Sequence, residues 1–328
     1  MVSTQMIYDA YARLSGNIRK TPILSSPFLD KIADKRLLIK AECLQHTGSF
    51  KYRGAWSAIS ALDQRSSSNG VIAYSSGNHA QAVAAVAKSF GLPAVIVMPS
   101  DAPKLKIENT KYHGAEVVLY NRLSESREEI GSYLAKKRNL TLIRPYEDPL
   151  VIAGQGTLGV EMADQLDQMG VKTADILVCC GGGGLSAGVT LALKDIAPEL
   201  TVRPCEPKFF DDTTRSLLSG KREFNDRGHT SICDAILTPT PGENTFRILR
   251  DFAGAGLVVS DEEVLEAMVA SYLRLKLVIE PGGAVALASA LFRKEEIQGD
   301  TVVAIVTGGN VDFDTLKLAF NSGRKRLM

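Results

Sequence analysis

The chain has 328 residues, of which 45% are hydrophobic and 23% charged, and its formal net charge at pH 7 is +1. This length is sufficient for two domains with a large core, and the balanced charge, without a long basic run, argues against nucleic acid as a partner. No apolar run approaches the length of a membrane span, and residues 1–5 do not begin a signal peptide. The five cysteines show no Cys-x-x-Cys spacing and are odd in number, which indicates free thiols. We therefore expect a globular cytoplasmic protein that does not associate with membranes.

The first part of the chain predicts a helix over residues 3–17 and an extended segment over 19–23. The apolar run 37–39 is expected to form a strand that leads into a turn, in which Thr47, Gly48 and Ser49 are candidate helix caps. Lys51 would then begin a helix that continues to Ala61.

Three strand–helix units follow. We expect strands at 71–74, 94–98, 116–120 and 140–143, with helices at 78–90, 102–113 and 124–137 between them. Short apolar strands that alternate with helices are typical of a parallel sheet covered on both faces. Further helices are predicted at 150–169, 185–196, 261–275, 283–292 and from 313, and further strands at 176–180, 201–205, 257–259 and 302–306. The segment 207–245 reads as irregular.

The position of Lys51 suggests a chemical role. A lysine beside a helix N-terminus feels the positive end of the helix dipole, and burial further lowers its pKa, so that the neutral amine is favoured. A neutral amine is what Schiff-base formation with an aldehyde requires. The alternative is a surface lysine in a turn.

The glycine run 181–184 lies between a buried strand and a helix. Without side chains, its backbone N–H groups can approach an anion, and the helix N-terminus adds a favourable field. The run differs from the Gly-x-Gly-x-x-Gly fingerprint and from the Walker A motif. It predicts a phosphate site, with a flexible turn as the alternative.

The string Ser-Phe-Lys-x-Arg-Gly at 49–54, after Thr-Gly, resembles the lysine motif of the fold-type II enzymes that use pyridoxal 5′-phosphate (PLP). These are the serine/threonine dehydratases, serine racemases and hydroxyaspartate dehydratases. The resemblance covers nearly the whole chain and implies an α/β fold of two doubly wound, mostly parallel sheets with the cofactor in the cleft between two domains. Residues 1–67 and 148–328 would form the large PLP-binding domain, and 68–147 the small domain with the substrate loop.

The resemblance also implies which residues hold the cofactor. Thr307 follows the last predicted strand, where the family has Ser or Cys facing the pyridine nitrogen. A neutral hydroxyl there leaves that nitrogen largely unprotonated and favours elimination. The implied cofactor-binding residues are Phe50, Lys51, Asn78, Gly181, Gly182, Gly183, Gly184 and Thr307.

The loop between the strand 71–74 and the next helix resembles the family's substrate loop, which holds the substrate carboxylate. That role maps onto Ser75, Ser76, Asn78 and His79. Ser76 also stands where serine racemases place a second proton-transfer group opposite the lysine, so Lys51 and Ser76 are the candidate catalytic residues. Arg127 could reach a second substrate carboxylate, and its alternative reading is a solvated helix residue.

Acidic residues follow the strand predicted at 201–205. Carboxylates, carbonyls and water are the ligands that hard divalent cations prefer, although most acid pairs in loops are simply solvated. The spacing Glu-Pro-x-x-x-Asp-Asp at 206–212 resembles the Mg²⁺ or Ca²⁺ site of serine racemases and hydroxyaspartate dehydratases. By position its ligands would be Glu206, the carbonyl of Phe210 and Asp212, with Mg²⁺, Ca²⁺ or Mn²⁺ bound.

The resemblance leads us to expect a PLP-dependent dehydratase, or ammonia-lyase, that eliminates water from 3-hydroxyaspartate, serine or threonine and forms a 2-oxo acid and ammonia. A serine or aspartate racemase that uses Lys51 and Ser76, a β-replacement synthase and a non-catalytic PLP-binding module remain alternatives. The chain has Ala235 where many relatives have glycine after the aspartate, which leaves the substrate open. A homodimer is expected because the family is commonly dimeric.

Overall fold

The larger of the two sheets has six strands. Its order is β1-β2-β10-β7-β8-β9, and every neighbouring pair is parallel except β1 with β2. The computed structural model describes residues 2–63, 69–226 and 228–322. The strands are β1 (Ile23–Ser25), β2 (Arg36–Ala41), β7 (Ala174–Cys179), β8 (Leu200–Pro207), β9 (Leu257–Val259) and β10 (Thr301–Val306).

The smaller sheet has four parallel strands in the order β5-β4-β3-β6. They are β3 (Val71–Tyr74), β4 (Ala94–Pro99), β5 (Glu116–Tyr120) and β6 (Thr141–Leu142). The predicted α/β fold with two mostly parallel sheets is confirmed.

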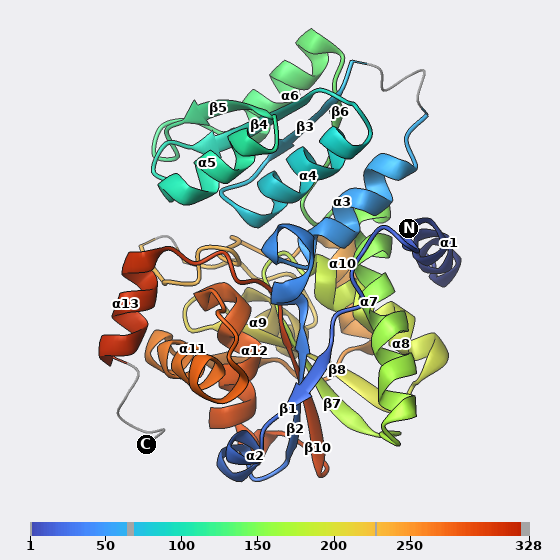
Figure 1. Ribbon diagram of the computed structural model, residues 1–328, viewed down its shortest axis with the longest axis vertical. Helices are drawn as coiled ribbons and strands as arrows, with labels where there is room; N and C mark the ends of the chain where they lie inside the picture. The colour runs from blue at the N-terminus through green and yellow to red at the C-terminus, as the bar shows by residue number, and fades with distance from the viewer. Residues whose placement is uncertain (1, 64–68, 227, 323–328) are drawn as a thin grey trace.

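Helices cover both faces of each sheet (Figure 1). They are α1 (Thr4–Leu14), α2 (Pro27–Ala33), α3 (Lys51–Ser60), α4 (Asn78–Ser89), α5 (Lys104–Tyr112), α6 (Arg127–Arg138), α7 (Pro149–Gln168), α8 (Gly184–Ile196), α9 (Asp212–Ser219), α10 (Glu243–Phe252), α11 (Asp261–Leu275), α12 (Pro281–Phe292) and α13 (Phe313–Ser322). Side chains of β7 alternate between two apolar layers. Leu177 packs in the layer that includes α11 and α12, and Ile176 in the layer that includes α7 and α8.

Three helices are absent from the prediction. The sequence patterns indicate no helix at α2. The segment 207–245 is predicted to be irregular, but it contains α9 and the start of α10. α10 is short and follows Pro241-Gly242, yet it buries Thr245, Phe246 and Leu249 on one face. Tertiary packing of that face stabilises it, and so short a segment would be marginal alone.

The turn before α3 also differs from the prediction. Thr47 and Gly48 belong to a 3₁₀ turn, and Ser49 pairs with Gly308 in an isolated β-bridge, so none of the three caps the helix. The N-cap is Phe50, whose backbone N–H donates to the carbonyl of Thr307 at 3.1 Å. This pairing places the start of α3 directly beside the end of β10.

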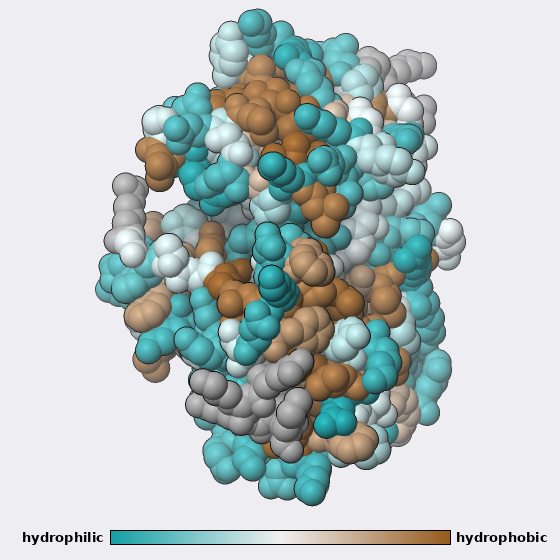
Figure 2. Space-filling view, turned by 60° about the vertical axis from the view of Figure 1, so that its left-hand side comes forward, coloured by the Kyte–Doolittle hydropathy of each residue, from teal (hydrophilic) through white to brown (hydrophobic). Residues whose placement is uncertain are grey.

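We call β3–β6 with α4–α6 the small lobe, and the six-stranded sheet with its helices the large lobe. Figure 1 shows the small lobe above the large one, with α3 between them. Figure 2 shows a surface hollowed between the two lobes, with apolar side chains gathered on each. Across the described parts of the chain, no helix is both long and apolar enough to cross a bilayer.

Candidate active site

One pocket lies where the two lobes meet. Its walls come from the segments after the carboxyl ends of β3, β7 and β10, from the start of α3 and from the segments 145–146 and 234–238. Ligands of parallel α/β sheets gather at such strand ends. The pocket brings together every residue that the sequence predicts for cofactor or substrate: Phe50, Lys51, Ser75, Ser76, Asn78, His79, Arg127, Gly181, Gly182, Gly183, Gly184 and Thr307.

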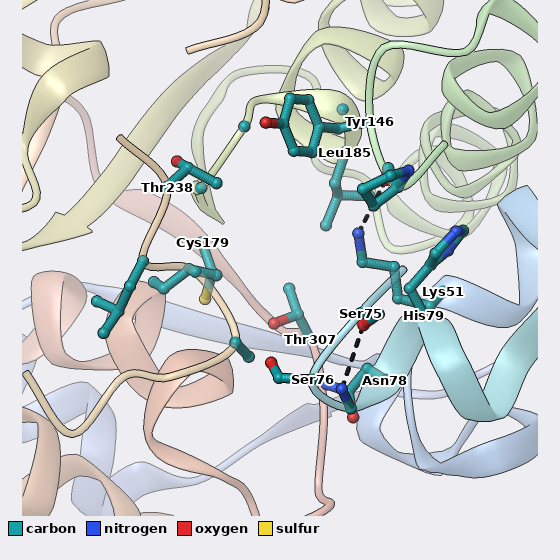
Figure 3. A pocket seen from close by; sticks show the side chains of 18 of the residues that line it. Lys51, Ser75, Ser76, Asn78, His79, Tyr146, Cys179, Leu185, Thr238 and Thr307 are labelled. Atoms are coloured by element: carbon teal, nitrogen blue, oxygen red, sulfur yellow. Dashed lines mark hydrogen bonds between the residues drawn. The ribbon is translucent and has the colours of Figure 1, made fainter. Parts of the chain in front are cut away.

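Lys51 is the first residue of α3, and its side chain reaches into the pocket (Figure 3). Its Nζ donates to the carbonyl oxygen of Pro145 at 3.0 Å. Burial lowers the pKa of Lys51 from 10.5 to about 8. A substantial fraction of the amine is therefore neutral near physiological pH, as reaction with an aldehyde requires.

The glycine loop follows β7 and leads into α8. Gly183 has a φ of +85°, a conformation that favours glycine. A Cβ on Gly182 would lie 2.4 Å from the ring of Tyr146, so no larger residue fits without a shift. The loop therefore presents bare backbone at the N-terminus of α8, an arrangement suited to a phosphate group.

The substrate loop joins β3 to α4. The hydroxyl of Ser75 accepts the N–H of Gly77 at 3.1 Å, and Ser76 lines the pocket (Figure 3). His79 is buried, and its Nε2 lies 3.0 Å from the carbonyl oxygen of Ile143. Burial, followed by the charge of Lys51, lowers the pKa of His79 to about 3, so its ring is neutral. It can orient a ligand by hydrogen bonding but brings no positive charge.

Asn78 is held between two residues of the large lobe. Its Nδ2 donates to the carboxylate of Glu280, and its Oδ1 accepts from Asn310 Nδ2 at 2.8 Å. Glu280 is buried at the N-cap of α12, and Thr307 is buried at the end of β10. The amide of Asn78 and the hydroxyl of Thr307 thus have defined places around the pocket.

Arg127 begins α6, on the side of the pocket formed by the small lobe. Its guanidinium lies 5.4 Å from the ring centre of Tyr74, and its Nε donates to Glu128 at 2.8 Å. The side chain is 30% exposed. It is therefore a cation at the edge of the pocket with some freedom to meet an anionic ligand, and it is not simply a solvated helix residue.

Among the pocket residues that sequence patterns did not predict, Lys106 and Cys179 carry titratable side chains. Lys106 of α5 is buried, and Cys179 at the end of β7 lines the pocket although the sequence indicates only a core residue. Lys106 and Thr110 stand four residues apart in α5 and are both buried, so Lys106 lies on the inward face of this helix. A lysine on the buried face of a helix requires a partner.

The predicted metal-site residues lie outside the pocket. Glu206 accepts from the backbone of Thr213 and Thr214 at 2.9 and 2.7 Å, while Asp212 Oδ1 accepts from Asn225. Asp212 Oδ2 is buried without a partner among the described residues. Burial is the largest cause that raises the pKa of both carboxyl groups, and the charge of Asp212 adds to it for Glu206. Within the described chain, no three His, Cys, Asp or Glu side chains cluster as candidate metal ligands, so a cation here would need the carbonyl of Phe210 or water as further ligands.

The fold of two mostly parallel sheets, with a buried lysine and a glycine loop in one pocket, is that of a PLP-dependent enzyme. The model of the family described as pyridoxal-phosphate dependent enzyme matches residues 14–308. The L-threo-3-hydroxyaspartate ammonia-lyase of Saccharomyces cerevisiae is 41% identical over 306 residues, which cover 93% of this chain and 92% of the relative.

Two solved structures agree with this match. Maize serine racemase superposes with a TM-score of 0.89 at 36% identity, covering 98% of this chain and 97% of that one. A threonine deaminase from T.th. gives 0.87 at 41% identity, covering 95% and 99%. The chain belongs to the pyridoxal-phosphate dependent enzyme family, of fold type II.

Proposed function

We propose that the protein is a dehydratase, or ammonia-lyase, that removes water from a 3-hydroxy amino acid and yields a 2-oxo acid and ammonia. The observation that carries this proposal is the buried, partly neutral Lys51 in one pocket with the glycine loop and the neutral hydroxyl of Thr307. The names of the similar proteins support it, since both an ammonia-lyase and a deaminase are among them.

The residues present fit PLP. The glycine loop would hold its phosphate, Thr307 would face its ring nitrogen, Asn78 would meet its 3′-oxygen, and Lys51 would bind its aldehyde. When bound, PLP withdraws electrons from the α-carbon of an attached amino acid and so acidifies the α-proton.

Each side chain would then have a separate role in the elimination. Ser75, Asn78 and His79 would orient the substrate carboxylate. Lys51 Nζ would accept the α-proton, a role that suits an amine whose pKa is about 8. Loss of the β-hydroxyl with a proton releases water, and hydrolysis of the resulting enamine, by way of the imino acid, gives the 2-oxo acid and ammonia.

Arg127 favours 3-hydroxyaspartate among the three candidate substrates. That substrate carries a second carboxylate, and a guanidinium at the pocket edge is the side chain best suited to bind it. Serine and threonine offer no group for this interaction.

A divalent cation at Glu206 and Asp212 is part of the proposal. Two neighbouring buried carboxylates are costly without a positive partner, and Asp212 Oδ2 has no hydrogen-bond partner among the residues that the structure describes. Mg²⁺, Ca²⁺ or Mn²⁺ would satisfy them, with the carbonyl of Phe210 as a further ligand, and would stabilise the start of α9. We also propose the domain boundaries 1–67, 68–147 and 148–328, a homodimer and a cytoplasmic location.

Racemisation is the second candidate. Ser76 lines the same pocket as Lys51, and maize serine racemase is among the similar structures. A hydroxyl on the opposite side of the substrate from the lysine could return the α-proton. If Ser76 does so, Ser76→Ala abolishes racemisation and spares elimination of one enantiomer.

Ammonia release from the 3-hydroxyaspartate isomers, L- and D-serine and L-threonine tests the proposal, with and without EDTA. We expect rapid release from 3-hydroxyaspartate that EDTA lowers and Mg²⁺ restores. No release from any of them by the PLP-loaded enzyme would contradict the lyase reading and shift the assignment to a racemase or a synthase.

A further inference from the structure

Lys106 is a buried lysine that neither the cofactor nor the elimination chemistry requires. It is the third residue of α5 in the small lobe and is 4% exposed. Its Nζ lies 2.9 Å from Asp234 Oδ2 and 3.4 Å from Glu280 Oε2, both of which belong to the large lobe. Burial lowers the pKa of Lys106, but the charges of Glu280 and Asp234 outweigh it and leave the pKa raised. Lys106 is therefore a cation that ties the two lobes together inside the pocket.

The stem of the same lysine packs against the substrate loop. A Cβ placed on Gly77 would lie 2.7 Å from Lys106 Cδ and 3.2 Å from its Nζ. A side chain at Gly77 would require either the end of Lys106 or the loop to shift. The lysine therefore packs directly against the loop between Ser76 and Asn78.

The ammonium group of Lys106 also reaches Asn78, through Glu280. One carboxylate oxygen of Glu280 faces Lys106, and the other accepts the amide of Asn78. Burial raises the pKa of Glu280, while Lys106 is the largest influence that lowers it. An ionised Glu280 accepts from Asn78 Nδ2 and fixes which way the amide points, and Asn310 completes the arrangement.

We propose that Lys106 is a positioning residue that fixes the substrate loop and Asn78 against the large lobe. It acts by the packing of its stem on Gly77 and by the charge that it places between Glu280 and Asp234. Without it, the loop loses a contact and Glu280 becomes a buried carboxylate without its cation, which is strongly unfavourable. The loop would then hold neither cofactor nor substrate firmly.

Five variants test this proposal: Lys106→Met, Lys106→Arg, Gly77→Ala, the double variant Gly77→Ala/Lys106→Met, and Lys111→Met as a control. Lys111 lies on the same helix and is exposed. The first readout is the dissociation constant of PLP from the apo-protein, with circular dichroism to verify folding. It needs no reaction and does not depend on the proposed function. The second is KM against kcat in the ammonia assay, which does rest on that function.

We expect Lys106→Met to weaken PLP binding about tenfold or more, and to raise KM more than it lowers kcat. Lys106→Arg should recover part of the affinity, since it keeps the charge, and Lys111→Met should match the wild type. Gly77→Ala should weaken PLP binding in the same direction. Both changes disrupt the same contact, so the double variant should bind PLP no more weakly than the weaker-binding single variant. If the two sites acted independently, their effects on the free energy of PLP binding would add.

PLP affinity of Lys106→Met within twofold of the wild type would overturn the proposal, and so would additive effects in the double variant. If Lys106→Met does not fold, Gly77→Ala and Lys106→Arg decide instead. Wild-type PLP affinity in both of them would then overturn it.

Discussion

Lys51 Nζ lies 3.0 Å from the carbonyl oxygen of Pro145. The next residue, Tyr146, packs its ring against Gly182. A neutral carbonyl accepts a hydrogen bond from the amine without supplying the opposite charge that a carboxylate would. Burial therefore dominates, and the pKa of Lys51 falls. The same short segment thus contacts the amine and shapes the glycine loop.

The rate at which the apo-protein binds PLP should depend on pH. The neutral amine is the form that reacts with the PLP aldehyde, and it increases as pH rises toward the pKa. The rate of reconstitution of the apo-protein should therefore rise through neutral pH and level off above about pH 8. Stopped-flow absorbance measures this rate. A rate that continues to rise beyond pH 10, as for an exposed lysine of pKa about 10.4, would refute the burial argument.

Gly182→Ala should weaken PLP binding by about tenfold, since overpacking typically costs ~1–3 kcal/mol. The added methyl would meet the ring of Tyr146 at 2.4 Å and displace the loop. Equilibrium titration of the apo-protein with PLP measures the change. Adding Tyr146→Ala removes the clash and should restore part of the affinity. A Gly182→Ala protein with unchanged affinity would show that the loop does not hold the phosphate.

Arg127→Gln should separate the candidate substrates. Removal of a charged hydrogen-bond donor costs ~1.5–3 kcal/mol, so KM for 3-hydroxyaspartate should rise by about tenfold or more while KM for serine changes little. Steady-state ammonia assays on both substrates measure this. Equal effects on the two substrates would mean that Arg127 supports the pocket in general and does not bind a second carboxylate.

If Glu206 and Asp212 bind a divalent cation, the melting temperature should rise when the cation is added. Saturating Mg²⁺ should raise the melting temperature of the wild type by several degrees, because a ligand that binds only the folded state stabilises it. Asp212→Asn should lose most of this response. It should also melt higher than the wild type in EDTA, because a neutral amide is less unfavourable to bury than a carboxylate whose Oδ2 has no partner among the described residues.

Asp211→Asn is the matched control, since Asp211 pairs with Arg215 nearby. It should keep the Mg²⁺ response. Differential scanning fluorimetry measures all three proteins, and a full response in Asp212→Asn would argue against this cation site.

Sequence patterns predicted most of the fold because its strands are short apolar runs followed by helices. The resemblance to fold-type II PLP enzymes predicted most of the residues that line the pocket, and the glycine loop, Ser75, Ser76 and Thr307 among them lie just after the ends of β7, β3 and β10. Sequence patterns failed for α9 and α10, where burial of one face outweighs weak local signals. They also failed for the cap of α3, because Ser49 is held by pairing with Gly308, which is remote in the sequence.

Buried charges were the least predictable feature. Arg53 follows Lys51 by two residues and is completely buried, where it pairs with Glu42 and Glu161. Lys106 likewise meets acids more than a hundred residues away in the sequence. No local pattern reveals such partners, because they meet only after the sheets have assembled.

Lys51 is the residue that we propose carries the cofactor and moves the α-proton. The most direct measurement is ammonia release by Lys51→Ala loaded with PLP, with its visible spectrum recorded alongside and Lys104→Ala, an exposed lysine of α5, as control. We expect Lys51→Ala to lose at least about a thousandfold in kcat, which is within the scale of losing an essential catalytic base. It should also lose the absorbance of lysine-bound PLP, while the control keeps both. Turnover retained in Lys51→Ala would show that another group moves the α-proton.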